Sequence, residues 1–133
     1  MSVSDAPTEI PGEVTERVDA LCRALPEVTT RTDESQVRSR PTAYSYDIRR
    51  RSFCLLVAKR GPSGKPAPFL VVRADPEDRE ALLSMGHPYF APRASPGRIG
   101  VLITKETDWE EIREVITESY RVLAPKKLIA RLD

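Results

Sequence analysis

Apolar residues recur at helical spacing in the last quarter of the chain, which predicts an amphipathic helix over residues 108–124. Acidic residues crowd its first turn, where the helix dipole favours negative charge. Thr107 and Glu110 have the spacing of a capping box, and Pro125 cannot continue a helix. The apolar stripe consists of Trp109, Ile112, Ile116, Tyr120 and Leu123. The opposite face is expected to be solvated, and it carries Glu111, Glu114, Glu118 and Arg121.

Two further helices are predicted from their start and stop signals. Residues 11–25 carry an apolar stripe and are followed by Pro26, which stops the helix. Asp75 is a typical N-cap because a proline follows at the first helical position, and Gly86 marks the end of that helix. A last helical turn is expected within residues 126–131.

Between the helices, alternating and β-branched residues predict strands. The predicted strands are residues 27–32, 37–48, 54–59, 69–73 and 99–104. Three consecutive arginines at 49–51 separate two of these strands as a turn, and the Gly- and Pro-rich residues 60–66 form a hairpin loop. Prolines interrupt residues 87–96, which are therefore expected to be irregular.

This element order, α-β-β-β-β-α-β-α, predicts an α+β fold of two layers. We expect an antiparallel sheet of about five strands with the helices on one face. With 133 residues the chain is long enough for one domain, which we place at residues 12–133. Residues 1–11 are expected to form a disordered N-terminal tail because they lack an apolar pattern.

Composition narrows the class of protein. Hydrophobic residues make up 40% and charged residues 31% of the chain, as in ordinary soluble domains. No apolar run approaches the length of a membrane span, and the N-terminus has no signal-peptide pattern. Cys22 and Cys54 have neither metal-ligand nor redox spacing. We therefore expect reduced thiols, a cytoplasmic protein, no membrane partner, no metal and no cofactor; the oligomeric state is left open.

The net charge of +1 conceals an uneven distribution. Residues 37–105, which contain most of the predicted strands, carry thirteen Lys and Arg against five acids. Residues 1–36 carry three Arg against eight acids, and residues 106–133 carry five basic residues against seven. A basic sheet beside acidic helices would make a polarised molecule. The alternative is that the arginines only keep strand edges soluble.

Several blocks, in their order and spacing, resemble the MmcQ/YjbR family of small bacterial proteins. The blocks are ALPEV at 24–28, the strand around Phe53, VRADPE at 72–77, YFAP at 89–92 and SYRVLAPKKL at 119–128. The resemblance covers about residues 14–131. Family members often carry a tryptophan where this chain has Ile99. The resemblance implies a compact domain on an antiparallel sheet and, by likeness to a double-wing module, DNA binding.

The residues themselves offer a DNA-binding surface at two basic turns. Projecting cationic tips can contact phosphates on double-stranded DNA, and about 4–6 such contacts would give a log–log salt slope of about −4 to −5. Binding of this kind is weak and directed at the backbone. The candidate residues are Arg49, Arg50, Arg51, Lys59, Arg60, Lys65, Lys126 and Lys127. For the last two, a purely structural role just after a helix C-terminus is the alternative.

A second hypothesis is an interaction module that binds a peptide or a small ligand. The irregular segment at residues 87–98, rich in proline and aromatic residues, could form one wall of a cleft between sheet and helices. The residues expected to line this cleft are His87, Tyr89, Phe90, Arg93 and Arg98.

Enzymatic chemistry has little support in the sequence. His87 is the single histidine, and no second group is placed by the sequence to activate a nucleophile with it. The stretch GPSGK at 61–65 resembles a phosphate-binding loop, but it lacks the spacing and the following helix. We therefore expect a protein that is not an enzyme.

Overall fold

The computed structural model describes residues 10–32, 43–60, 66–92 and 96–132, apart from the side chains of Lys59, Arg60 and Pro66. Within these residues a six-stranded antiparallel sheet has the strand order β1-β2-β3-β4-β6-β5. The strands are β1 (Thr29–Thr32), β2 (Ala43–Ile48), β3 (Arg51–Arg60), β4 (Pro66–Arg73), β5 (Tyr89–Phe90) and β6 (Arg98–Leu102). The helices are α1 (Gly12–Arg23), α2 (Pro76–Met85), α3 (Trp109–Leu123) and α4 (Lys126–Ile129), and a 3₁₀ turn, Ala130–Leu132, follows.

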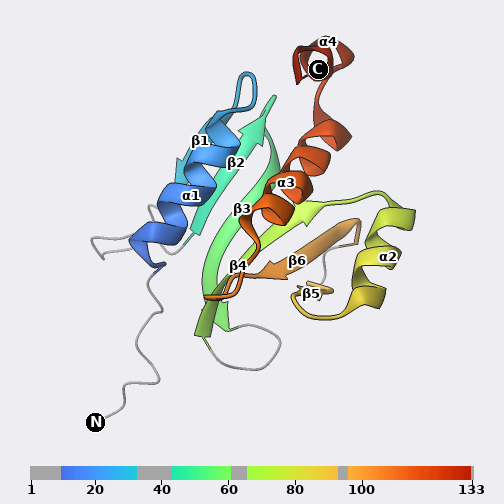
Figure 1. The fold of residues 1–133 in the computed structure, drawn as a ribbon. Coiled ribbons are helices and arrows are strands. Elements are labelled where there is room, and N and C mark those ends of the chain that lie inside the picture. Colours follow the sequence, from blue (N-terminus) through green and yellow to red (C-terminus); the bar gives the residue numbers. More distant parts are fainter. Residues whose placement is uncertain (1–9, 33–42, 61–65, 93–95, 133) are drawn as a thin grey trace.

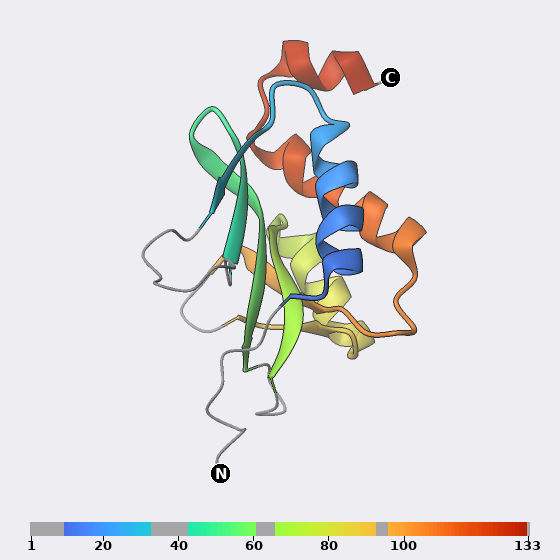
Figure 2. The same ribbon diagram turned by 90° about the vertical axis from the view of Figure 1, so that its left-hand side faces the viewer.

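The molecule has two layers, and the expected α+β fold is confirmed. Figure 2 shows α1, α2 and α3 on one face of the sheet, whereas α4 lies across one end of it. The other face, called here the open face, has no helix of the described residues upon it. The sheet has one strand more than the five expected, because β5 adds a short sixth strand to β6 at the edge.

Strand β5 lies in a segment expected to be irregular. Gly100 of β6 faces Phe90 of β5, and a Cβ at position 100 would lie 2.3 Å from Cζ of that ring. The missing side chain therefore makes room for Phe90, which also packs edge-to-face on Phe69 with ring centroids 5.4 Å apart. This local fit explains why two residues between prolines can still join the sheet.

The core lies between the sheet and the helices. Its fully buried side chains come mostly from alternate strand positions and from the apolar stripe of α3; an irregularity in the β2–β3 register lets both Phe53 and Cys54 be buried. The largest of them are Tyr46, Tyr120, Phe53, Ile48, Leu56, Leu70, Ile99 and Ile116. Phe53 and Tyr120 meet edge-to-face with centroids 5.5 Å apart, which ties α3 to β3. The stripe predicted for α3 therefore has the predicted role.

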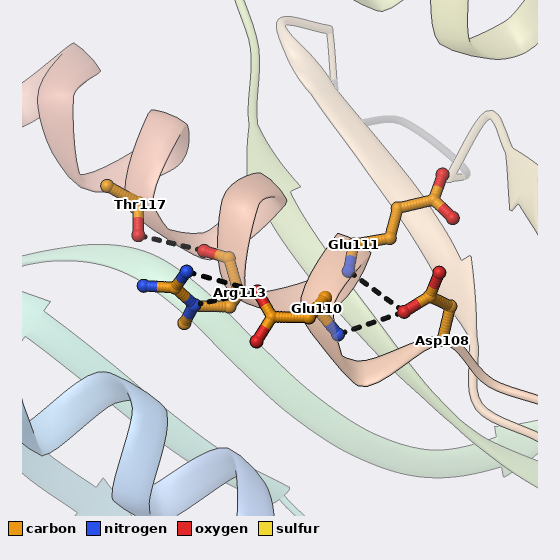
Figure 3. Close-up of polar contacts among 5 residues, drawn as sticks. All are labelled: Asp108, Glu110, Glu111, Arg113 and Thr117. Carbon is orange, nitrogen blue, oxygen red and sulfur yellow. Dashed lines mark hydrogen bonds and ion pairs between the residues drawn. The ribbon is translucent and has the colours of Figure 1, made fainter.

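The start of α3 differs from the predicted capping box. Asp108 is the N-cap, and its carboxylate accepts hydrogen bonds from the backbone N–H groups of Glu110 and Glu111 (Figure 3). The Thr107 hydroxyl accepts a hydrogen bond from the backbone N–H of Thr104 instead, at 2.7 Å. A carboxylate is the stronger acceptor at the positive end of the helix dipole, so Asp108 takes the capping position.

The N-terminal boundary also differs from the expectation. The predicted tail extends to residue 11, but Ile10 is buried in the hydrophobic core. Ordered packing therefore begins before α1, and residues 1–9 lie outside the described part of the chain.

Candidate functional site

Three arginines meet at one end of the sheet. Arg51 opens β3, Arg73 closes β4 and Arg98 opens β6, so the antiparallel order brings all three to the same end. Arg73 and Arg98 are direct cross-strand partners. Burial, followed by the charges of Arg98 and Arg51, lowers the pKa of Arg73. The structure thus holds three like charges close together.

Hydrogen bonds fix the positions of Arg73 and Arg98. The Arg73 guanidinium donates from Nε to the Ser52 carbonyl at 2.8 Å, and its backbone N–H donates to the Ser119 hydroxyl at 2.8 Å. The Ser119 hydroxyl donates in turn to the Phe53 carbonyl, so one buried side chain of α3 joins β3 to β4. On β6, the Arg98 carbonyl accepts a hydrogen bond from Arg79 of α2 at 2.7 Å.

The predicted basic turn lies at the same end of the sheet. Arg49 and Arg50 both have positive φ, 53° and 69°, which is the geometry of a two-residue hairpin turn. Arg49 forms an ion pair with Glu27 at 3.3 Å, and Arg50 is exposed. The sequence predicts all three arginines in the turn, but Arg51 is the first residue of β3.

The C-terminal lysines extend this end of the molecule. Figure 1 shows α4, which begins at Lys126, at the same end of the sheet as the turn between β2 and β3. Arg131 and Arg49 both act on the hydroxyl of Tyr120, opposing the rise in its pKa that burial and Glu27 cause. Lys126 and Lys127 are exposed. We call the set Arg50, Arg51, Arg73, Arg98, Lys126 and Lys127 the basic end.

The second predicted turn lies elsewhere. It follows β3, whereas the first precedes it, and a ten-residue strand separates the two turns by about 30 Å. The two turns therefore do not form one patch. The side chains of Lys59 and Arg60, and the whole of Lys65, lie outside the described residues.

A shallow hollow of about 390 Å³ adjoins the basic end on the open face. Its lining includes Arg98, Arg31 and hydroxyls from Ser45 and Ser52. Arg31 donates to the buried carboxylate of Asp47 at 2.5 Å, so its charge is compensated. The Ser52 hydroxyl is buried and has no hydrogen-bond partner. The hollow therefore offers the guanidinium of Arg98, which has no ion pair among the described residues.

The helix side carries a larger cavity, of about 690 Å³, between α2, α3 and the sheet. We call it the helix-side pocket. Of the residues predicted for a cleft, Tyr89 lines it, and its hydroxyl donates to Glu111 at 2.5 Å. Two other predicted residues do not line this pocket. Phe90 packs on Phe69, and Arg98 belongs to the basic end.

The two remaining residues predicted for the cleft are His87 and Arg93. His87 is exposed and does not line the helix-side pocket, and Arg93 lies outside the described residues. The pocket is lined instead by five carboxylates, namely Asp75, Asp78, Glu111, Glu114 and Glu118. The sequence had placed the last three on a solvated helix face and the first two at the start of α2. Helical spacing shows that Glu111, Glu114 and Glu118 share a face, but not that α2 stands opposite that face.

Neither cysteine is exposed to solvent. Cys22 and Cys54 are free and buried, and burial, with a hydrogen bond to Cys54, raises the pKa of Cys22.

The described residues include no group of three or more His, Cys, Asp or Glu side chains placed to hold a metal ion. No helix in the described part of the chain is long and apolar enough to cross a membrane.

Comparison with known proteins agrees with the sequence resemblance. A search of curated proteins finds no significant match. The model of the YjbR family matches residues 23–122, which include the whole sheet and most of α3. Because that match spans well over half of the chain, the chain belongs to the YjbR family.

Proposed function

We propose that this protein binds double-stranded DNA through the phosphate backbone, with the basic end as the contact surface, and that it acts by binding and not by catalysis. Membership of the YjbR family is compatible with this proposal. The support comes from the placement of charges among the described residues.

The observation that carries the proposal is the register of Arg73 and Arg98. Like charges directly opposite each other on neighbouring strands destabilise a sheet. Among the described ion pairs, none joins Arg51, Arg73 or Arg98 to a carboxylate. A phosphate between the guanidinium groups would remove this repulsion and would accept several charge-assisted hydrogen bonds.

The adjoining hollow extends the contact. Arg98 lines this hollow, so a phosphate oxygen there would accept hydrogen bonds from its guanidinium. Arg50, Lys126 and Lys127 are exposed around the same end and can contact further phosphates.

The orientation of the molecule on DNA follows from its charge distribution. Helix α3 has Glu110 and Glu111 in its first turn, and α2 has Glu77 and Asp78, so both would be repelled by a groove. The basic end, and not either helix, must therefore face the duplex. No helix enters a groove in this arrangement, so binding is directed at the backbone and has little sequence preference.

The test is fluorescence anisotropy of a labelled duplex, titrated with protein at several salt concentrations. About 4–6 phosphate contacts predict a log–log slope of about −4 to −5. The triple variant Arg49→Glu, Arg50→Glu, Arg51→Glu should lose binding at low salt. An absence of binding by the native protein at low salt, or unchanged binding by the triple variant, would refute the proposal.

A further inference from the structure

The helix-side pocket is a cavity that DNA binding at the basic end does not use. Its floor includes Val72 and Ile99, whose side chains lie on the helix side of the sheet, and its walls come from α2 and α3. At about 690 Å³ it lies within the range of small-molecule sites, about 300–1,000 Å³. It therefore has the size to enclose most of a small organic ligand.

The pocket has apolar walls that the fold does not cover. Helix α2 has no buried residue, although Leu82 faces the pocket and Leu83 also packs against the core. On the opposite wall, Val122 of α3 is 50% exposed, which among the described large apolar residues is exceeded only by Met85. Apolar surface that is concave and open to water is a site where a hydrocarbon or aromatic group gains free energy by burial.

The rim of the pocket is strongly acidic. Five carboxylates line it, against the two arginines Arg73 and Arg121. Arg121 forms an ion pair with Glu118 at 3.5 Å, and Arg73 donates from its guanidinium to the Ser52 carbonyl. Within the described residues, Asp75, Asp78, Glu111 and Glu114 have no ion pair with a basic side chain.

The carboxylates act on one another and on the pocket floor. The charge of Asp75 is the main cause that raises the pKa of Asp78. Tyr89, at the floor, donates its hydroxyl to Glu111, which fixes that carboxylate at the pocket wall. Because the described carboxylates are not grouped as metal ligands, a cation with an organic body suits the pocket better than a metal ion.

We propose that the helix-side pocket binds a small organic cation, an amine or guanidine attached to an apolar or aromatic body. The apolar body would lie against Val72, Leu82 and Val122, and the cationic group would approach Glu111 and Glu114. This charge is opposite to that of a nucleic-acid ligand, so the two sites select different ligands although Arg73 borders both.

Three indole compounds of similar size separate charge from hydrophobicity. Tryptamine is a cation, tryptophol is neutral, and indole-3-acetate is an anion. Each is titrated into ¹⁵N-labelled protein and followed by NMR chemical shifts. We expect tryptamine to shift resonances of the pocket residues and to bind about fivefold or more tightly than tryptophol, with indole-3-acetate weakest. Equal affinities for the three compounds, or no shift with tryptamine, would overturn the proposal.

Variants locate the site. The double variant Glu111→Gln, Glu114→Gln removes two charges but keeps an acceptor for Tyr89, and it should weaken tryptamine binding about fivefold or more. Val122→Arg, at a half-exposed position, should place a competing cation in the pocket and abolish binding. Glu110→Gln is the matched control, because Glu110 is on the same helix but pairs with Arg113 outside the pocket (Figure 3). Native-like binding by Val122→Arg, or an equal loss in the control, would contradict the assignment.

Discussion

Arg73 and Arg98 stand directly opposite each other on β4 and β6, with Arg51 close enough to lower the pKa of Arg73 further. The sheet thus holds a repulsive cluster in a fixed place, supported by the hydrogen bond from the Arg73 backbone to Ser119. Like charges held close together lower the stability of the free protein and raise its affinity for a ligand of opposite charge. Stability and binding should therefore respond in opposite directions to the same substitution.

Replacing Arg98 with glutamate should stabilise the free protein. The variant Arg98→Glu converts a like-charge cross-strand pair with Arg73 into an opposite-charge pair. We expect the free energy of unfolding to rise by a few tenths to about 1 kcal/mol, measured by urea denaturation at low salt. Arg98→Ala should give a smaller rise. A clear loss of stability in Arg98→Glu would show that the two arginines do not repel each other in solution.

Removing one phosphate contact should change the salt dependence of DNA binding by a predictable amount. The variant Arg51→Ala should reduce the magnitude of the log–log salt slope by about 1, because one fewer counterion is released. Arg113→Ala serves as the control, since Arg113 pairs with Glu110 on α3 away from the basic end. The slopes come from anisotropy titrations, and identical slopes for Arg51→Ala and the native protein would remove Arg51 from the contact surface.

The Ser119 hydroxyl should contribute measurably to stability. It accepts a hydrogen bond from the Arg73 N–H and donates one to the Phe53 carbonyl, and it is fully buried. Ser119→Ala leaves both backbone groups without a partner, which should cost about 1–3 kcal/mol in urea denaturation. Ser84→Ala, which removes an exposed hydroxyl of α2, should cost much less. Equal effects of the two substitutions would contradict this role of Ser119.

The packing of Phe90 on Gly100 can be tested by a pair of substitutions. Gly100→Ala would place a Cβ 2.3 Å from Cζ of Phe90, so we expect a loss of about 1–3 kcal/mol from overpacking. In a Phe90→Leu background the same change should cost less, because leucine lacks the distal ring atoms. A double-mutant cycle by thermal or urea unfolding measures the difference. Additive effects would mean that β5 does not pack on β6 as described.

Much of the fold could be predicted because local signals agreed with tertiary packing. Helix α2 begins after the N-cap Asp75 with Pro76 and ends at Gly86, as the capping preferences of these residues predict. The apolar stripe of α3 is buried, and Pro125 follows the end of the helix. Strand β5 was missed because its place in the sheet depends on Gly100, a residue ten positions away in the sequence.

The candidate sites were harder to predict, because they depend on the register and on the relative placement of helices. Arg73 received no role from the sequence, although strand alternation puts it on the face opposite Leu70 and Val72. Its partner Arg98 was assigned to a cleft on the other side of the sheet. Only the pairing of β4 with β6 brings the two together. Likewise, Glu114 is exposed and Glu111 partly exposed, as predicted, but only the placement of α2 makes them part of a pocket lining.

The most direct test of DNA binding at the basic end compares two charge reversals that change the net charge equally. Arg98→Glu alters the basic end, and Lys105→Glu alters an exposed residue beyond the opposite end of β6. Anisotropy titrations of one labelled duplex are run with both variants and the native protein at the same low salt. We predict that Arg98→Glu weakens binding about tenfold or more, the equivalent of about 1.4 kcal/mol, whereas Lys105→Glu binds nearly as the native protein does. Equal weakening by the two variants, or native affinity in Arg98→Glu, would contradict DNA binding at the basic end.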